Sequence, residues 1–508
     1  MRTTGSGDLQ GTDSLLQDRP RVSRLARRPP GESDAGQPRG GEEIGRTAAA
    51  DSPARRRRGK PEESGRGRRE DRQNPRLATA RRRPGLARRD AQPRPPRWHA
   101  VTTPEPNDSN RIRHRLLVRV AVALHEGGAP SYRIEDTLAI LGRGLNIETS
   151  VFAVPTGLTI GLGPLNEQTV RVIRTQPHAP SLERLRLVND VVHELIAGDQ
   201  DADAAITRLD AISSRPPRWS AGWILVAFCM TGLGVSRLAG GSTGTILGAG
   251  IASLGVGIVL LLLGRSPSRI ALGEITAAFT ASFIVTATLP LLHGDTVLTT
   301  VAAIIVLVPG LTLTIAMREL AMGHLTSGTA RLMGAMKSFV ALAFGAGIGE
   351  QVGSLIMNGG PPETTLAPLG GIGVLLAVIG AGLGLMILLE ESPKMAPWFI
   401  AAVLVGWGSI HFAGPIGPPE VSAALAALVV GLAGNLANRI LGLPAAILVV
   451  PGLIVLVPGA LGFAGIRALI AEDAVAGLET IIDTALIGGG LVAGLLVATL
   501  LIPPRSTL

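Results

Sequence analysis

Apolar residues follow three patterns along the chain, and the longest one fills the C-terminal half. From Trp219 onward, apolar stretches of about 20 residues succeed one another with short polar connections between them. A helix of that length rises about 30 Å, which is enough to cross the hydrocarbon core of a bilayer. We therefore predict ten transmembrane helices, at 219–237, 244–263, 271–291, 297–317, 332–352, 369–389, 396–413, 421–440, 445–466 and 481–502.

In residues 111–215, short amphipathic patterns typical of a soluble region replace the long apolar stretches. Apolar residues from Arg111 to Glu126 recur at helical spacing, and Ser131 is predicted to be the N-cap of a second helix. Alternating apolar and polar residues then predict strands, and two further helical patterns follow. This pattern predicts a small cytosolic α+β domain, with strands at Thr149–Val154, Leu158–Leu162 and Thr169–Arg174 and helices at Leu182–Ala197 and Ala202–Ile212.

Residues 1–110 show no sustained apolar period. They hold 25 of the 48 Lys and Arg residues but 15 of the 39 Asp and Glu residues, so this segment carries a net charge of +10. Such a sequence cannot bury enough apolar surface to offset its ordering entropy, and we predict a disordered tail. The tail is either a basic arm that contacts anionic lipid or an extension without a structural role.

Composition agrees with a helical membrane protein. Hydrophobic residues make up 46% of the chain, aromatic residues only 3%, and there are 65 glycines. Small and aliphatic residues of this kind are typical of helices packed in a bilayer. Cys229 is the one cysteine, which excludes disulfides and Cys-based metal sites. The sequence has no nucleotide-binding loop of the form GxxxxGK[ST]. We therefore predict neither an enzyme nor a cofactor, a metal or a nucleic-acid partner.

The loop charges predict an orientation. With the N-terminus inside, nine Lys or Arg residues fall on internal segments of the membrane part and two, Arg237 and Arg467, fall on external ones. Ten spans return the C-terminus to the same side. The chain is thus predicted to be a multi-pass protein of the plasma membrane with both termini in the cytoplasm.

A repeat divides the membrane part into two halves. The pentapeptide VLVPG at Val306–Gly310 recurs at Val455–Gly459, and Arg318 falls on Arg467 with the same shift of 149 residues. Each half, 216–360 and 361–508, then contains five predicted spans. Because five is odd, the second half enters the membrane from the opposite side, which is the inverted-repeat architecture of many secondary transporters.

Proline and glycine interrupt the fourth and ninth predicted spans. Pro309-Gly310 and Pro458-Gly459 are repeat mates, and Pro451-Gly452 predicts a second break in span nine. Proline removes a backbone donor, and freed backbone groups at membrane depth are tolerated only against protein or a water-filled cavity. Matched interrupted helices are the best sequence indication of a transporter's binding site, so we predict that these residues bind substrate.

Several separated motifs resemble the threonine/serine exporter family. The stretch LHEGGAPSYRIE at Leu124–Glu135 is similar to that family's N-terminal signature, and VPTGLTI at Val154–Ile160 resembles the strand segment that follows it. Leu187-Val188-Asn189 resembles a later helix of the same domain. The fourth-span region through Arg331 and the proline-glycine pairs of span nine resemble the two halves of its membrane part, although Glu319 stands where many members carry Asp.

This resemblance implies export of threonine or serine, driven by the proton motive force, by ten spans behind a cytosolic domain. Relatives that are split over two chains are associated with dicarboxylate export, so a small dicarboxylate such as succinate is the alternative cargo. A second alternative is a ligand-sensing or hydrolytic cytosolic domain on a membrane anchor. The predicted partners are the amino-acid substrate, protons and the lipid bilayer, and a homo-oligomer stays open.

Few residues inside the predicted spans can ionise. A charge at the bilayer centre costs about 2.5–3.5 kcal/mol on insertion scales, so such residues usually face a cavity. Glu274 and Asp483 are our candidates for proton coupling, followed by His411. Asn435 in span eight is a candidate for hydrogen bonding to substrate, or it bonds one helix to another.

Charged residues near the span ends are candidates for gating. Arg318, Glu319 and Arg331 lie at the inner mouth of spans four and five, where they attract a carboxylate, form a gate or merely orient the helices. In the soluble region, Arg133 and Glu135 either tie that region to a membrane loop or form a structural ion pair. Arg467, on the outer side, completes the predicted gating set.

Overall fold

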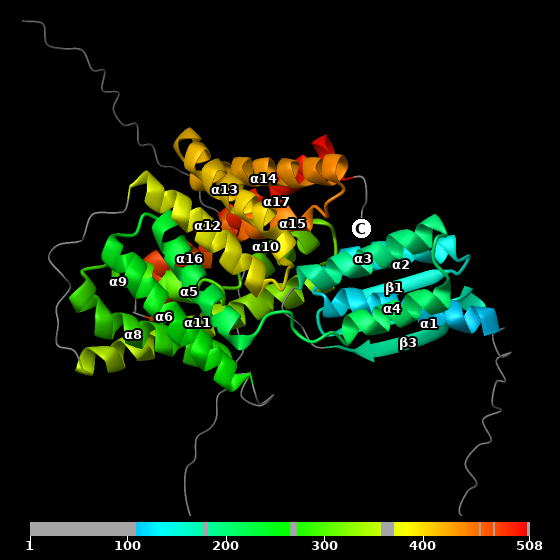
Figure 1. Cartoon of the computed structure of the whole chain (residues 1–508), viewed down its shortest axis with the longest axis horizontal. Helices are drawn as coiled ribbons and strands as arrows, with labels where there is room; N and C mark the ends of the chain where they lie inside the picture. Colours follow the sequence, from blue (N-terminus) through cyan, green and yellow to red (C-terminus); the bar gives the residue numbers. More distant parts are fainter. Residues whose placement is uncertain are drawn as a thin grey trace, which may run out of the picture. The chain divides into compact units, whose positions relative to one another are not determined.

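The computed structural model describes residues 108–175, 181–264, 272–356, 370–456, 459–470 and 473–504. Of the predicted tail, 1–110, only the last three residues fall within this part, at the start of the first helix. Pro458 of the predicted substrate site lies outside the described residues. Within them the fold is mostly helical, with a single three-stranded sheet (Figure 1).

The N-terminal region combines four helices with an antiparallel sheet in the order β1-β2-β3. All three predicted strands are confirmed, with β2 beginning one residue earlier than predicted. Val154 pairs with Gly157, which leaves Pro155 and Thr156 as a tight turn between β1 and β2. The elements are α1 (Asp108–Glu126), α2 (Ser131–Gly144), β1 (Thr149–Val154), β2 (Gly157–Leu162), the 3-10 turn η1 (Leu165–Glu167), β3 (Thr169–Arg174), α3 (Leu182–Ala197) and α4 (Ala202–Ser213).

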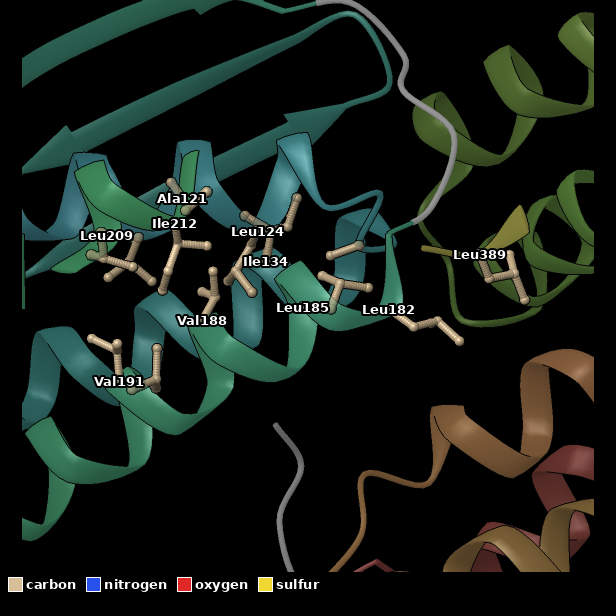
Figure 2. Packing of buried hydrophobic residues seen from close by; sticks show 14 of the residues in the cluster. Ala121, Leu124, Ile134, Leu182, Leu185, Val188, Val191, Leu209, Ile212 and Leu389 are labelled. Atoms are coloured by element: carbon tan, nitrogen blue, oxygen red, sulfur yellow. The ribbon is translucent and has the colours of Figure 1, made fainter. Parts of the chain in front are cut away.

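The core of this region forms where the apolar faces of the helices meet. Leu124 of α1, Ile134 of α2, Val188 of α3 and Leu209 of α4 are buried in one cluster, and Figure 2 shows their side chains converging between the helices. This burial matches the helical spacing of the apolar residues in the sequence. The predicted N-cap is wrong by one residue, because Pro130 holds the N-cap position and Ser131 begins the helix.

Twelve further helices make up the rest of the described chain. They are α5 (Ala221–Leu238), α6 (Thr243–Leu263), α8 (Gly273–Leu292), α9 (Thr296–Ile304), α10 (Gly310–Ala321), α11 (Leu325–Ile356), α12 (Gly371–Leu388), α13 (Ala396–Ala413), α14 (Pro419–Leu441), α15 (Ala446–Leu456), α16 (Gly459–Ile470) and α17 (Ala474–Leu501). Two 3-10 turns, η2 (Pro393–Met395) and η3 (Gly414–Ile416), flank α13.

Nine helical segments in the described ranges are long and apolar enough to cross a bilayer, when α15 and α16 are counted as one. The chain is therefore a polytopic helical membrane protein by length and composition. The remaining predicted span, 297–317, is divided into α9 and α10, which have 9 and 12 residues. Neither piece alone spans a bilayer, so the count of ten depends on joining them.

Glycines bring several of these helices into backbone contact. A Cβ on Gly345 or Gly349 of α11 would lie 2.3 Å from a carbonyl oxygen of α8, at Ile275 and Phe279 respectively. In the C-terminal half, a Cβ on Gly494 of α17 would lie 2.1 Å from the carbonyl oxygen of Ala424 on α14. Only glycine permits such close packing, as is common for helices in membranes.

Helices α5 and α12 pack side by side (Figure 1) through a reciprocal contact. A Cβ on Gly234 of α5 would lie 2.7 Å from the carbonyl oxygen of Ala377, and a Cβ on Gly384 of α12 would lie 2.9 Å from that of Ala227. Exchanging the two helices turns each of these contacts into the other. Reciprocal contact of this kind is what a two-fold axis between two helices produces.

The interruption predicted in the fourth span is present. Helix α9 ends at Ile304, residues 305–309 are not helical, and α10 begins at Gly310. Helix α15 ends at Leu456 and α16 begins at Gly459. Residues 457–458, between them, lie outside the described residues. The second break predicted at Pro451-Gly452 is wrong, because both residues lie inside α15. Gly452 instead gives close packing, with Val430 at 2.9 Å from the position of a Cβ.

Candidate functional site

The interruption of the fourth span and the first residue of α16 meet at a cavity of about 290 Å³, here called the central cavity. Its lining includes Pro309, Gly310 and Gly459, together with the first turn of α10. A Cβ on Gly459 would lie 2.4 Å from Cγ1 of Val308 and 3.8 Å from Cα of Gly310, so the start of α16 touches the interruption of span four there. The volume corresponds to roughly ten waters at about 30 Å³ each, which suits a small solute.

Glu274 is the acidic residue of the central cavity lining in the described chain. One carboxylate oxygen accepts a hydrogen bond of 2.7 Å from Oγ of Ser338, which also lines the cavity. The other oxygen lies 2.7 Å from Nζ of Lys337, whose side chain is largely exposed. A carboxylate therefore faces the same space as the N-terminus of α10, where backbone N–H groups lack helical acceptors.

A second cavity, of about 220 Å³, lies where α2 meets α10, α14, α15 and α17. Its polar lining includes Arg133 of α2, Arg318 and Thr314 of α10, and Asn435 of α14. We call it the arginine cavity. Nδ2 of Asn435 also donates to the carbonyl oxygen of Ala498 on α17 at 3.4 Å, so this residue both lines the cavity and bonds two helices.

Glu319 holds the N-terminal region against the membrane helices. Its side chain is fully buried, and Oε1 accepts a hydrogen bond of 2.9 Å from the backbone N–H of Ser131. Nε of Arg331 donates to both carboxylate oxygens at 3.1 Å. A carboxylate 188 residues away in sequence thus caps α2, where the helix dipole favours a negative charge.

The predicted residue Glu135 also contacts this junction. Its Oε1 accepts from the backbone N–H of Ala153 at 2.9 Å, and Oε2 lies 3.4 Å from Nδ1 of His324 in the α10–α11 connection. Burial raises the pKa of Glu135, while the Ala153 hydrogen bond and His324 oppose the rise. Tyr132 lies between His324 and Arg318, with Cζ of Arg318 5.0 Å from its ring centroid.

A second junction involves residues that the sequence analysis missed. The fully buried Glu391, in the α12–α13 connection, lies 3.4 Å from Nη2 of Arg186 on α3. The backbone N–H of Leu182 donates to the carbonyl oxygen of Leu389 at 3.0 Å, and Figure 2 shows these two side chains at the junction. The sequence feature that could have indicated this junction is the position of Glu391, an acidic residue in a short connection between two apolar spans.

The remaining predicted residues lie elsewhere. Arg467 of α16 pairs with Glu350 of α11, far along α11 from Arg331. Asp483 is exposed on α17 and lines neither of the two cavities. The structure thus brings Glu274, Pro309, Gly310 and Gly459 together at one cavity.

The arginine cavity collects the other predicted residues. Arg133, Arg318 and Asn435 line it, and Glu319, Arg331 and Glu135 lie at the neighbouring junction.

Comparisons with known proteins agree with these features. A family model for threonine/serine exporters matches residues 115–353, which include α2, the α9–α10 interruption and Glu274. A second threonine/serine exporter model matches residues 373–501. The chain belongs to the threonine/serine exporter family. Both matches together cover the N-terminal region and both halves of the membrane part.

Several curated relatives come from yeasts and share the name pheromone-regulated membrane protein 10. The Eremothecium gossypii protein is 26% identical over 349 residues, which is 65% of this chain and 45% of the relative. The Saccharomyces cerevisiae protein is 26% identical over 345 residues, covering 65% of this chain and 44% of the relative. The chain therefore spans less than half the length of these relatives. No solved structure matches the chain.

Proposed function

We propose that this exporter-family protein is a secondary exporter of threonine, serine or a related small hydroxy amino acid. The observation that carries the proposal is the central cavity, where the interruption of span four meets the start of α16 beside Glu274. An α-amino acid carries both an ammonium and a carboxylate group. Glu274 attracts the ammonium group, and the first turn of α10 after Gly310 offers N–H donors and a positive dipole to the carboxylate.

Helix packing supports two inverted five-span repeats. If spans one to five are α5, α6, α8, α9–α10 and α11, then α12, α13, α14, α15–α16 and α17 are their mates. Contacts follow this exchange: α8 packs on α11 as α14 packs on α17, and α6 packs on α9 as α13 packs on α15.

Close contacts at glycines repeat in the same way. The contacts of Gly345 and Gly349 with α8 recur, shifted by 145 residues, as those of Gly490 and Gly494 with α14. The reciprocal α5–α12 contact follows a shift of 150 residues, close to the 149 of the shared pentapeptide. These contacts support joining α9 with α10 into one of ten spans. With ten spans both termini lie on one side, which we assign by loop charge to the cytoplasmic side of the plasma membrane.

Two ion pairs on α11 support alternating access. Arg331 pairs with Glu319 at the end of α10, and Glu350 pairs with Arg467 near the end of α16. Arg331 and Glu350 are 19 residues apart, which is about 28 Å along a helix. We assign the first pair to an inner gate and the second to an outer gate, opened in turn as one repeat rocks against the other. Glu274 is the coupling carboxylate in this scheme, which needs a group that binds a proton on one side and releases it on the other.

Counterflow in proteoliposomes tests the proposal. Vesicles loaded with unlabelled threonine are offered labelled threonine, with and without a proton gradient. We expect uptake above empty vesicles that responds to the gradient, and loss of that response in Glu274→Gln. Glu479→Gln is the matched control, because Glu479 is an exposed carboxylate on α17.

Other outcomes would change the assignment. Uptake of succinate but not of threonine or serine would make the protein a dicarboxylate exporter. Absence of uptake of any of these solutes by folded protein would refute the carrier and favour a ligand-binding or hydrolytic role for the N-terminal region. Equal behaviour of Glu274→Gln and Glu479→Gln would remove Glu274 from coupling.

A further inference from the structure

The arginine cavity has an uncompensated positive charge. Arg133 and Arg318 both line it, and in the described ranges neither guanidinium group makes a hydrogen bond or an ion pair. The Nε atoms of both residues are buried without a partner. Buried donors in proteins normally have an acceptor, so two buried and unpaired Nε atoms of arginines that line one cavity indicate a missing anion.

The acidic residues close to this cavity are already engaged. Glu319 follows Arg318 in sequence, but its carboxylate is held by Ser131 and Arg331. Glu135 is bound to Ala153 and His324. Burial lowers the pKa of Arg133; Tyr132 opposes this shift, and the nearby charge of Arg318 adds to it. Among the described lining residues there is no Asp or Glu.

The remaining lining suits a small organic solute. Leu185, Leu311, Ile315 and Val449 supply an apolar wall beside the two arginines. Arginine presents a planar fork of donors that matches a carboxylate with two parallel hydrogen bonds. Arg318 is also kept in place by the ring of Tyr132.

We propose that the arginine cavity binds a small organic anion with one or two carboxylates, held by Arg133 and Arg318. Such a ligand bridges α2 of the N-terminal region and α10 of the membrane part. The site differs from the central cavity in its charge preference. A zwitterionic amino acid would place its ammonium group near two cations here, whereas Glu274 accepts that group in the central cavity. The inference thus goes beyond the proposed function and does not require transport.

Thermal unfolding of the purified full-length chain in detergent tests the proposal. Midpoints are measured at increasing concentrations of sodium succinate, sodium phosphate, L-threonine and L-threonine amide. We expect a saturable rise with succinate and none with threonine amide, which has no carboxylate. Arg133→Gln and Arg318→Gln are each expected to weaken succinate binding about 10- to 100-fold, the usual effect of losing a charge-assisted hydrogen bond. Arg143→Gln, at an exposed arginine of α2, is the matched control and is expected to bind succinate as the wild type does.

Glu274→Gln separates this inference from the proposed function. Succinate binding is expected to survive in Glu274→Gln and to be lost in the two arginine variants, with the opposite pattern for threonine. Arg318→Lys keeps the positive charge but lacks the planar fork of donors, so it is expected to bind succinate more weakly than the wild type. Its side chain is similar in size to that of arginine, so the variant also serves as a control for folding. Because Arg133 makes no hydrogen bond or ion pair in the described ranges and Arg318 contacts only the ring of Tyr132 there, the Gln variants are expected to keep an unliganded midpoint close to that of the wild type.

Three results would overturn the inference. The first is wild-type succinate binding in both arginine variants. The second is an equal loss in Arg143→Gln, which would indicate only a general effect of charge. The third is saturable phosphate binding that succinate does not displace, which would assign the cavity to an inorganic oxyanion instead of a carboxylate.

Discussion

Replacing Glu319 with alanine tests whether the junction between α2 and the membrane helices is held by one buried carboxylate. The substitution removes the acceptor of the Ser131 N–H and leaves Arg331 without its partner in a site where its side chain is only 17% exposed. Removing one member of a buried ion pair costs about 3–5 kcal/mol, because the other charge stays buried and unpaired. A free-energy change of this size lowers the local stability of α2 roughly 150- to 5,000-fold.

Hydrogen exchange of the full-length chain in detergent measures this change. The amides of α2 are expected to lose protection in Glu319→Ala, while those of the α8–α11 contact keep it. Glu194→Ala is the matched control, because Glu194 pairs with Arg208 at 2.5 Å but both side chains are about 40% exposed. Exposed pairs contribute only about 0–1 kcal/mol, so this variant should leave α2 unchanged.

Glu319→Gln is a second, more conservative variant in case Glu319→Ala does not fold. Its amide oxygen still accepts from Ser131, so an intermediate loss of protection is expected. Equal protection of α2 in Glu319→Ala and Glu194→Ala would refute the reasoning, since it would show that the buried pair contributes no more than an exposed one.

Two further predictions concern packing and pH. Gly494→Ala is expected to destabilise the folded chain by about 1–3 kcal/mol in thermal unfolding, because its Cβ would meet a backbone oxygen at 2.1 Å, whereas Gly489→Ala on the same helix meets nothing within 4 Å and should be neutral. Burial raises the pKa of Glu135, so its stabilising effect is fully present below the unfolded value of about 4.3 and is lost as pH rises through the folded value. Glu135→Gln should flatten this part of the stability profile, and an unchanged profile would contradict the assignment.

Local patterns in the sequence were sufficient for the elements of the N-terminal region. The strands follow from alternation and from the Pro-Thr-Gly turn, both of which act over a few residues. The N-cap of α2 was predicted wrongly because its acceptor is Glu319, which is distant in sequence. Sequence alone could not show this contact, since local spacing carries no information about a partner 188 residues away.

The candidate site was only partly accessible to sequence reasoning. The proline-glycine repeat correctly indicated an interruption at Pro309, yet the same dipeptide at Pro451 lies inside a helix. A proline kinks or ends a helix depending on what receives the freed carbonyl groups, and that depends on tertiary packing. Likewise, Glu274 and Asp483 had equal weight as charges within spans, and only the fold shows that Glu274 lines a cavity while Asp483 is exposed on α17.

Helix α10 connects the two cavities, and this connection leads to a last prediction. Its first turn lines the central cavity, Thr314 and Arg318 line the arginine cavity, and Leu311 lines both. A ligand in either cavity therefore favours particular positions of the same 12-residue helix, which follows the non-helical segment 305–309. Coupling between two binding sites is reciprocal, so succinate must change the affinity for threonine by the same factor as threonine changes the affinity for succinate. Titration of each ligand at a saturating concentration of the other measures both factors; factors of one would show that α10 does not couple the cavities.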